Sequence, residues 1–243
     1  MNIPTNPFGQ PIGLPVLDWQ PVSPPPLTPM EGQFCRVEPL DIDRHGSDLF
    51  SAFSDEQGDR NWTYLPYGPF ETEADLRTWI TTYCVGSDPL FHAIVDKATS
   101  GAVGVASYLR IVPAVGVIET GHIHFSPLLQ RRPAATEAMV LMMRRVFSEL
   151  GYRRYEWKCD ALNGPSRRAA ERLGFRFEGI FRQATIYKGR NRDTAWYSIL
   201  DREWPCLERA FSQWLDAENY DENGEQKASL GTLIETTRKA EGI

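Results

Sequence analysis

The pattern of apolar and polar positions divides the chain into short strands and amphipathic helices. Runs of β-branched and aromatic residues between turn residues are typical of strands. They occur at 34–39, 90–95, 104–111, 117–125, 155–159, 176–181, 185–188 and 195–200. Apolar residues at every third or fourth position are typical of helices. That spacing occurs at 41–53, 72–83, 139–150, 163–173 and 203–215. The mixture predicts an α/β (α+β) fold in which helices pack on a sheet.

Capping residues mark several of the expected helix boundaries. Asp41 and Asn163 each stand at a helix start, where a side-chain oxygen can accept backbone N–H bonds. Pro165 suits the first turn of the second of these helices, and Gly174 lies just beyond its end. Residues 139–143 include three methionines at helical spacing, which indicates a core face rather than a set of ligands.

Composition narrows the classes of function. The chain has 243 residues, 42% of them hydrophobic, and a formal net charge of −6. An acidic chain of this kind is not expected to bind nucleic acid non-specifically, and no apolar run is long enough to cross a membrane. The four cysteines form no Cys-x-x-Cys pair, so we expect no metal site, and reduced thiols in a cytoplasmic protein. They are Cys35, Cys84, Cys159 and Cys206.

The two ends of the chain differ from its middle. Residues 1–31 form a proline-rich arm, with nine of the 18 prolines, and they cannot be helical. Because Trp19 and its neighbours are apolar, we expect this arm to dock on the domain or on a second subunit, which suggests a homodimer; a disordered leader is the alternative. Residues 32–215 form the folded domain. Residues 216–243 are polar and are expected to be a mobile tail.

The main candidate site lies between residues 122 and 136. The strand ending His122-Ile123-His124-Phe125 leads into the turn at 130–136, which opens a helix. Such a turn offers backbone donors and a helix dipole to a diphosphate. A second strand then leads into a second capped helix. Two units of this kind, side by side, can hold an elongated cofactor that carries phosphate groups.

The second unit also carries a specific motif. Residues 163–175 fit the pattern Asn-x-x-Ser-x-Arg-x-Ala-Glu-x-x-Gly-Phe, at Asn163, Ser166, Arg168, Ala170, Glu171, Gly174 and Phe175. From Gly32 to Trp204 the chain resembles the GNAT acyltransferases, in particular the branch with the ribosomal-protein N-terminal acetyltransferases. The resemblance implies a mixed, mostly antiparallel sheet of about seven strands, split by a cofactor cleft and flanked by helices. It also implies an acetyl-CoA-dependent N-acetyltransferase that acts directly on a primary amine.

The resemblance implies which residues hold acetyl-CoA. Backbone groups of Ile123 and Phe125 would hold the acetyl carbonyl and the pantetheine, and Asn163 the pantetheine as well. Pro133 departs from the family pattern, because it fills a glycine position and lacks an N–H. The charges of two arginines compensate for that lost donor. The turn residues expected to bind the diphosphate are Gln130, Arg131, Arg132, Ala134, Ala135 and Thr136.

The resemblance also implies catalytic roles. Ser166 would protonate the departing thiolate, and Glu119 would act as base. His122 and His124 are rival bases, since imidazole titrates near neutral pH, and water is a third possibility. Strict alternation along a strand places Glu119 and the two histidines on opposite faces, so we expect only one kind to reach the cleft.

The acceptor is expected to be a peptide N-terminus, a polyamine or another small amine. The resemblance places Trp62, Tyr64 and Tyr67 on the acceptor side of the cleft, where aromatic faces suit apolar or cationic groups. The alternative is a loop whose aromatics only cover the core. A catalytically inactive acyl-CoA sensor or scaffold is the alternative for the whole protein.

Overall fold

The computed structural model describes residues 3–54, 59–222 and 224–242. These residues contain one sheet of eight strands in the order β1-β2-β3-β4-β5-β6-β8-β7. The strands are β1 (Met30–Glu31), β2 (Cys35–Pro39), β3 (Leu90–Asp96), β4 (Ala102–Val112), β5 (Val117–Phe125), β6 (Arg154–Asp160), β7 (Arg176–Tyr187) and β8 (Arg190–Leu200). The longer helices are α1 (Ile42–Phe53), α2 (Glu73–Tyr83), α3 (Pro133–Arg144), α4 (Gly164–Arg172), α5 (Trp204–Leu215) and α6 (Leu230–Glu241).

The sheet is mixed and mostly antiparallel, as the sequence predicts. β5 and β6 pair in parallel, and the neighbouring pairs on both sides are antiparallel. The strand that exceeds the expected seven is β1, which has two residues and pairs with β2. A two-residue strand carries no alternation pattern, so it could not be predicted from the sequence.

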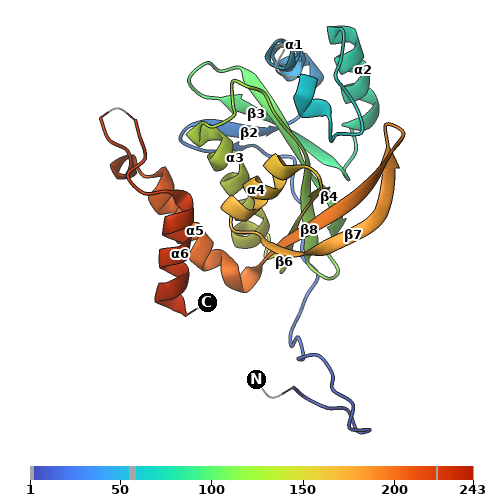
Figure 1. Ribbon diagram of the computed structural model, residues 1–243, viewed down its shortest axis with the longest axis vertical. Helices are drawn as coiled ribbons and strands as arrows, with labels where there is room; N and C mark the ends of the chain where they lie inside the picture. The colour runs from blue at the N-terminus through green and yellow to red at the C-terminus, as the bar shows by residue number, and fades with distance from the viewer. Residues whose placement is uncertain (1–2, 55–58, 223, 243) are drawn as a thin grey trace.

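Helices cover both faces of the sheet (Figure 1). On one face, α1 and α2 pack over β3 and β4, with Leu49, Leu76 and Phe91 in the shared core. On the other face, α3, α4 and α5 share a larger core that includes residues 138–143. The three methionines of that segment are at most 1% exposed, which confirms their assignment to the core.

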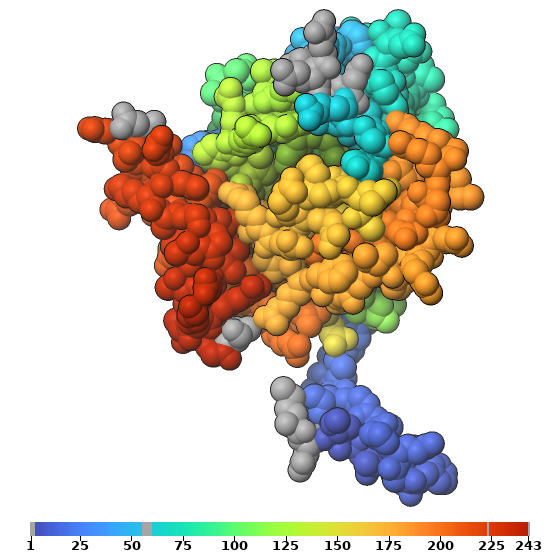
Figure 2. Space-filling view, in the orientation of Figure 1, coloured from blue at the N-terminus to red at the C-terminus, as the bar shows by residue number. Residues whose placement is uncertain are grey.

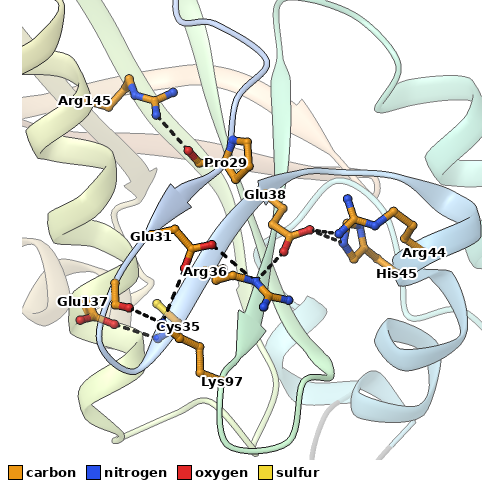
Figure 3. Close-up of polar contacts among 11 residues, drawn as sticks. Pro29, Glu31, Cys35, Arg36, Glu38, Arg44, His45, Lys97, Glu137 and Arg145 are labelled. Carbon is orange, nitrogen blue, oxygen red and sulfur yellow. Dashed lines mark hydrogen bonds and ion pairs between the residues drawn. The ribbon is translucent and has the colours of Figure 1, made fainter.

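A carboxylate fixes α3 to the edge of the sheet. The Glu137 side chain is 4% exposed and accepts three backbone N–H bonds. Its oxygens lie 2.6 Å from the nitrogen of Gln33, 2.7 Å from that of Phe34 and 2.8 Å from that of Cys35. Figure 3 shows Glu137 reaching from its helix to the start of β2. The contact therefore sets where the first turn of α3 lies.

The N-terminal arm is docked only in its second half. The Trp19 indole N–H donates to the carbonyl of Ala114 at 2.8 Å, and the ring packs against Gly116. Before it, Phe8 is 87% and Leu17 is 78% exposed. Figures 1 and 2 show this segment, in blue, projecting from the body of the molecule.

The C-terminal segment contains a helix where the sequence predicts a mobile tail. Residues 230–241 form α6, which packs on α5 and buries Leu230 and Ile234. Two apolar residues four positions apart are enough to anchor a short helix on a neighbour, but they are a weak signal in a polar stretch. No helix in the described part of the chain is both long and apolar enough to span a bilayer.

We predict that Glu137→Gln lowers the free energy of unfolding by about 2–3 kcal/mol, because it removes a charged acceptor from buried N–H groups. Urea denaturation followed by circular dichroism measures this change. Glu235→Gln is the matched control, since Glu235 is exposed and pairs with Lys239 on its own helix; it should change stability by less than about 0.5 kcal/mol. Equal effects of the two substitutions would contradict the anchoring role of Glu137.

We predict that stability falls as the pH drops below about 6.5, the ordinary pKa of histidine. Burial lowers the pKa of His92 to about 4 and that of His124 to about 3. Between these values and 6.5 the unfolded chain binds more protons than the folded one, so acid favours unfolding. The expected loss is about 2 kcal/mol per buried histidine between pH 7 and pH 5.

Urea midpoints measured at pH 7.5, 6 and 5 test this prediction. His124→Phe keeps an aromatic ring against Trp62 and removes the titrating group. The variant should therefore lose less stability over the same pH range than the parent protein. A parent curve that is flat from pH 7.5 to 5 would contradict the prediction.

Candidate active site

A gap between β5 and β6 forms the centre of the site. The two strands pair in register from Val117 with Arg154 to Thr120 with Trp157. Beyond that point, among the described residues, β5 continues to Phe125 and β6 to Asp160 without further pairing between them. The backbone of Ile123 therefore faces a gap on the β6 side, where a ligand can bond to it. The side-chain amide of Gln130 donates to the carbonyl of Phe125 at 2.7 Å.

A bulge in β5 turns additional side chains toward the α1–α2 face. Ser107 of β4 pairs with Gly121, and Val105 pairs with His124, so β5 carries one residue more than its partner over this interval. His122 lies in the bulge with φ of 51°, in the left-handed region. Because paired residues share a face, His124 lies on the same face as Gly121 and therefore as Glu119. The expectation that Glu119 and the histidines occupy opposite faces is wrong, since alternation fails at the bulge.

Glu119 lies within a line of alternating charges. Its Oε1 is 2.7 Å from a guanidinium nitrogen of Arg110, and its Oε2 is 2.7 Å from Nζ of Lys158. Lys158 is also 2.7 Å from Glu156, and Arg154 continues the line at 2.6 Å from Glu156. Both Glu119 and Lys158 are less than a tenth exposed. Buried charges persist when each has partners of opposite sign, and the carboxylate of Glu119 is thus already committed to two cations.

The two histidines of β5 are neutral at neutral pH. Burial, helped by the charges of Arg110 and Arg192, lowers the pKa of His122 to about 4. Its Nδ1 lies 2.8 Å from the hydroxyl of Tyr67. His124 is stacked on Trp62, with ring centroids 3.7 Å apart. Groups with such low pKa values accept protons weakly, which argues against either histidine as a strong general base.

The helix start expected to bind a diphosphate opens into the cleft. α3 begins at Pro133, and its N-cap, Arg132, makes no side-chain capping bond among the described residues. The preceding Arg131 has φ of 62°. Thr136, in the first helical turn, accepts a bond from Arg172 of α4 at 3.0 Å. Ala134 is buried in the core, so only its backbone is available to a ligand.

Ser166 is placed by two contacts at the start of α4. Asn163 caps this helix, with its side-chain oxygen 3.1 Å from the nitrogen of Ser166. The indole N–H of Trp157 donates to the Ser166 hydroxyl at 3.0 Å. An indole is only a donor, so the hydroxyl accepts from it and keeps its own proton to donate elsewhere.

The aromatic loop divides between cleft and core. Tyr64 lines the cleft, and its hydroxyl donates to the carbonyl of Leu162 at 3.2 Å. Trp62 is 1% exposed beneath His124, which corrects the expectation that it forms part of the acceptor wall. Tyr67 reaches the site through its bond to His122. The sequence shows that these rings are apolar but not which of them the sheet covers.

The cleft also contains residues that sequence reasoning did not single out. Arg110 interrupts a mainly apolar strand, and a charge in such a run was a usable signal, whereas Lys158 is one of several charged residues on its strand. Arg192 lies on β8. Trp214 of α5 and Tyr220, which follows this helix, also line the cleft. No sequence pattern links these positions, because they come from separate elements.

The cleft fits acetyl-CoA. Its volume is about 1690 Å³, above the roughly 300–1,000 Å³ typical of small-molecule pockets. It joins the strand gap, Ser166 and the open start of α3. A smaller hollow of about 340 Å³ lies between α4 and α6, outside this arrangement. The residues described do not include three His, Cys, Asp or Glu side chains placed to hold a metal ion.

Comparisons with known proteins agree with this geometry. The acetyltransferase (GNAT) domain family matches residues 36–176. A crystal structure of a GCN5-related N-acetyltransferase from Brucella melitensis is 50% identical, covers 90% of this chain and all of that one, and has a TM-score of 0.89. A probable acetyltransferase of the GNAT family from Chromobacterium violaceum is 42% identical over 80% of this chain and 97% of that one, with a TM-score of 0.75.

Among curated proteins, the uncharacterized N-acetyltransferase YnaD of Bacillus subtilis is similar to this chain. The two are 35% identical over 144 residues, which is 58% of this chain and 81% of that protein. The matched family domain covers more than half of the chain, including the gap between β5 and β6 and the helix starts beside it. The chain therefore belongs to the GNAT acetyltransferases, a family that carries out acetyl-CoA-dependent acetyl transfer.

Proposed function

We propose that this protein transfers an acetyl group from acetyl-CoA directly to a primary amine, without a covalent enzyme intermediate. The observation that carries the proposal is the position of Ser166. Its hydroxyl lines the cleft at the start of α4, accepts the indole N–H of Trp157, and retains a proton to donate. Bound acetyl-CoA supplies an activated thioester, and the residues of the chain supply position and protons.

Residues from both helix starts would hold the cofactor. Arg131, Arg132 and the first turn of α3 face its diphosphate, where cationic side chains and backbone N–H groups bind anions. Ala135 and Thr136 continue this surface into the helix. The backbone of Ile123, in the strand gap, is available to the acyl end.

Ser166 and Glu119 would act on different groups in the reaction, Ser166 on the sulfur of the cofactor and Glu119 on the amine. Ser166 Oγ donates its proton to the departing sulfur and takes a replacement proton from water. Glu119 accepts a hydrogen bond from the incoming amine and orients it. Because both of its oxygens already contact cations, the proton of the amine passes to water rather than staying on this carboxylate.

We predict that Ser166→Ala lowers kcat by about 100-fold, the lower range for loss of a general acid, and leaves the Kd for acetyl-CoA unchanged. A thiol-release assay and calorimetric titration measure the two quantities. Ser148→Ala is the matched control, because Ser148 also accepts an indole N–H, from Trp204 at 2.7 Å, and belongs to a different region of the fold. Unchanged turnover in Ser166→Ala would remove this residue from the mechanism.

We predict that Arg172→Met raises the Kd for acetyl-CoA about tenfold, since it removes a cation that bonds the first turn of α3. Calorimetric titration measures the change, and Arg77→Met on α2, which leaves the cleft intact, should have no effect. If the parent protein does not bind acetyl-CoA, the proposed function fails. If it binds tightly but acetylates no amine, a non-catalytic sensor is the better description.

A further inference from the structure

The cleft is basic although the protein is acidic. The formal net charge is −6, yet eight cationic and two acidic side chains line the cleft among the residues that the structure describes. Four of the cations lie around the starts of α3 and α4, namely Arg131, Arg132, Arg168 and Arg172. A diphosphate and a phosphate monoester together carry about four negative charges. The cofactor therefore accounts for this half of the positive charge and not for the other half.

The remaining cations line the acceptor end: Arg60, Arg110, Lys158 and Arg192. The two acids there are already engaged. Glu119 contacts Arg110 and Lys158, and Asp160 accepts bonds from the Tyr187 hydroxyl and a backbone N–H at 2.8 Å. Counted over the described side chains that line it, the acceptor end therefore keeps an excess of about two positive charges. Such an excess attracts anions and repels polycations.

Arg192 carries a buried donor that a ligand can satisfy. Its Nε has no hydrogen-bond partner among the residues that the structure describes, and its guanidinium carbon lies 5.9 Å from the centroid of the Tyr187 ring. Leaving a buried donor without a partner is unfavourable, so a ligand that satisfies it is favoured. The charges of Arg192 and Arg110 both help to lower the pKa of His122, which lines the cleft. The two guanidinium groups thus act on the same part of the cleft.

The backbone of Arg110 is strained, and contacts with Asp88 hold it in place. It has φ of 47°, in the left-handed region, at an irregularity in the pairing of β4 with β5. The carboxylate of Asp88 accepts the backbone N–H of Arg110 at 2.8 Å and that of Ile111 at 3.0 Å. A non-glycine residue in this conformation is strained and persists where surrounding contacts hold it, often at functional sites.

A bridge across the acceptor end limits the size of what can enter. At the tip of the β7–β8 hairpin, Nζ of Lys188 donates to the carbonyls of Trp62 at 2.9 Å and Gly68 at 2.7 Å. Arg190 donates to the carbonyl of Thr63 at 2.6 Å. Figure 1 shows β7 and β8 curving toward α2, and Figure 2 shows the orange and cyan surfaces in contact. A small molecule fits beneath such a bridge more readily than the surface of a folded protein.

We propose that the acceptor is a small primary amine that carries a carboxylate, such as an amino acid, and that Arg110 and Arg192 hold that carboxylate. The inference rests on the proposed function and names its substrate class. The planar guanidinium group matches a carboxylate with two parallel bonds. Glu119, beside Arg110, faces the amino group, so the pair matches both charges of a zwitterion. Polyamines are disfavoured by the same excess of positive charge.

A matched acceptor panel tests the proposal. The protein is given α-amino acids, the corresponding amino-acid amides, phosphoethanolamine and spermidine. All are compared at equal concentrations of neutral amine, because amide formation lowers the pKa of the α-amine. The acids should exceed their amides at least tenfold in kcat/KM. Faster reaction of the amides or of spermidine would overturn the inference and leave the acetyltransferase function standing, and preference for phosphoethanolamine would replace carboxylate by phosphate.

Substitutions test which side chains bind the carboxylate of the acceptor. Arg192→Met should raise KM for the preferred acid about tenfold while KM for its amide stays constant, and Arg192→Lys should recover part of the loss. Arg110→Met should also raise KM for the acid. Arg77→Met is the control. Calorimetric titration of the acid into the protein with CoA gives a readout independent of turnover: binding that weakens in Arg192→Met supports the carboxylate site. Absence of such binding overturns it, and acid binding without acetylation of any amine refutes the proposed function alone.

Discussion

The parting of β5 and β6 is the constraint on which the site depends. A parallel pair that stayed in register to its ends would satisfy its backbone groups internally. Here the pairing stops after Thr120 and Trp157, so the later backbone of β5 is available to a ligand. The bulge at His122 accompanies this change, and Glu137 holds α3 so that its first turn opens beside the gap. The cleft is thus a property of the sheet rather than of a single loop.

Much of the fold was predictable because short-range interactions determine where its helices begin. Capping by Asp41 and Asn163 depends on short-range bonds, and both residues cap helices in the structure. The bulge was not predictable from alternation, because the residue in the left-handed region is His122, not a glycine. The burial of Trp62 under His124 was also not predictable from the sequence, since contacts between distant segments decide which aromatic ring a sheet covers.

The line of charges through Glu119 changes what this residue can do. Its carboxylate has a cation 2.7 Å from each oxygen, so ion pairs on both sides hold it in place. A group held in this way suits orientation of an amine. The sequence placed Glu119 on the right strand, but its partners on β4 and β6 come from the sheet register. The chemistry of the residue was therefore fixed by neighbours that no local motif contains.

The two ends of the cleft differ in how the chain encodes them. The cofactor end comes from two continuous segments, 130–136 and 163–172, so a sequence motif reveals it. The acceptor end is assembled from β4, β6, β8 and the loop after α1, and its excess of positive charge appears only when Arg110 and Arg192 are brought together. The aromatic residues alone suggested an acceptor with apolar or cationic groups. The assembled charges favour one that carries a carboxylate, because at short range in a partly buried cleft a net charge outweighs the quadrupole of a ring.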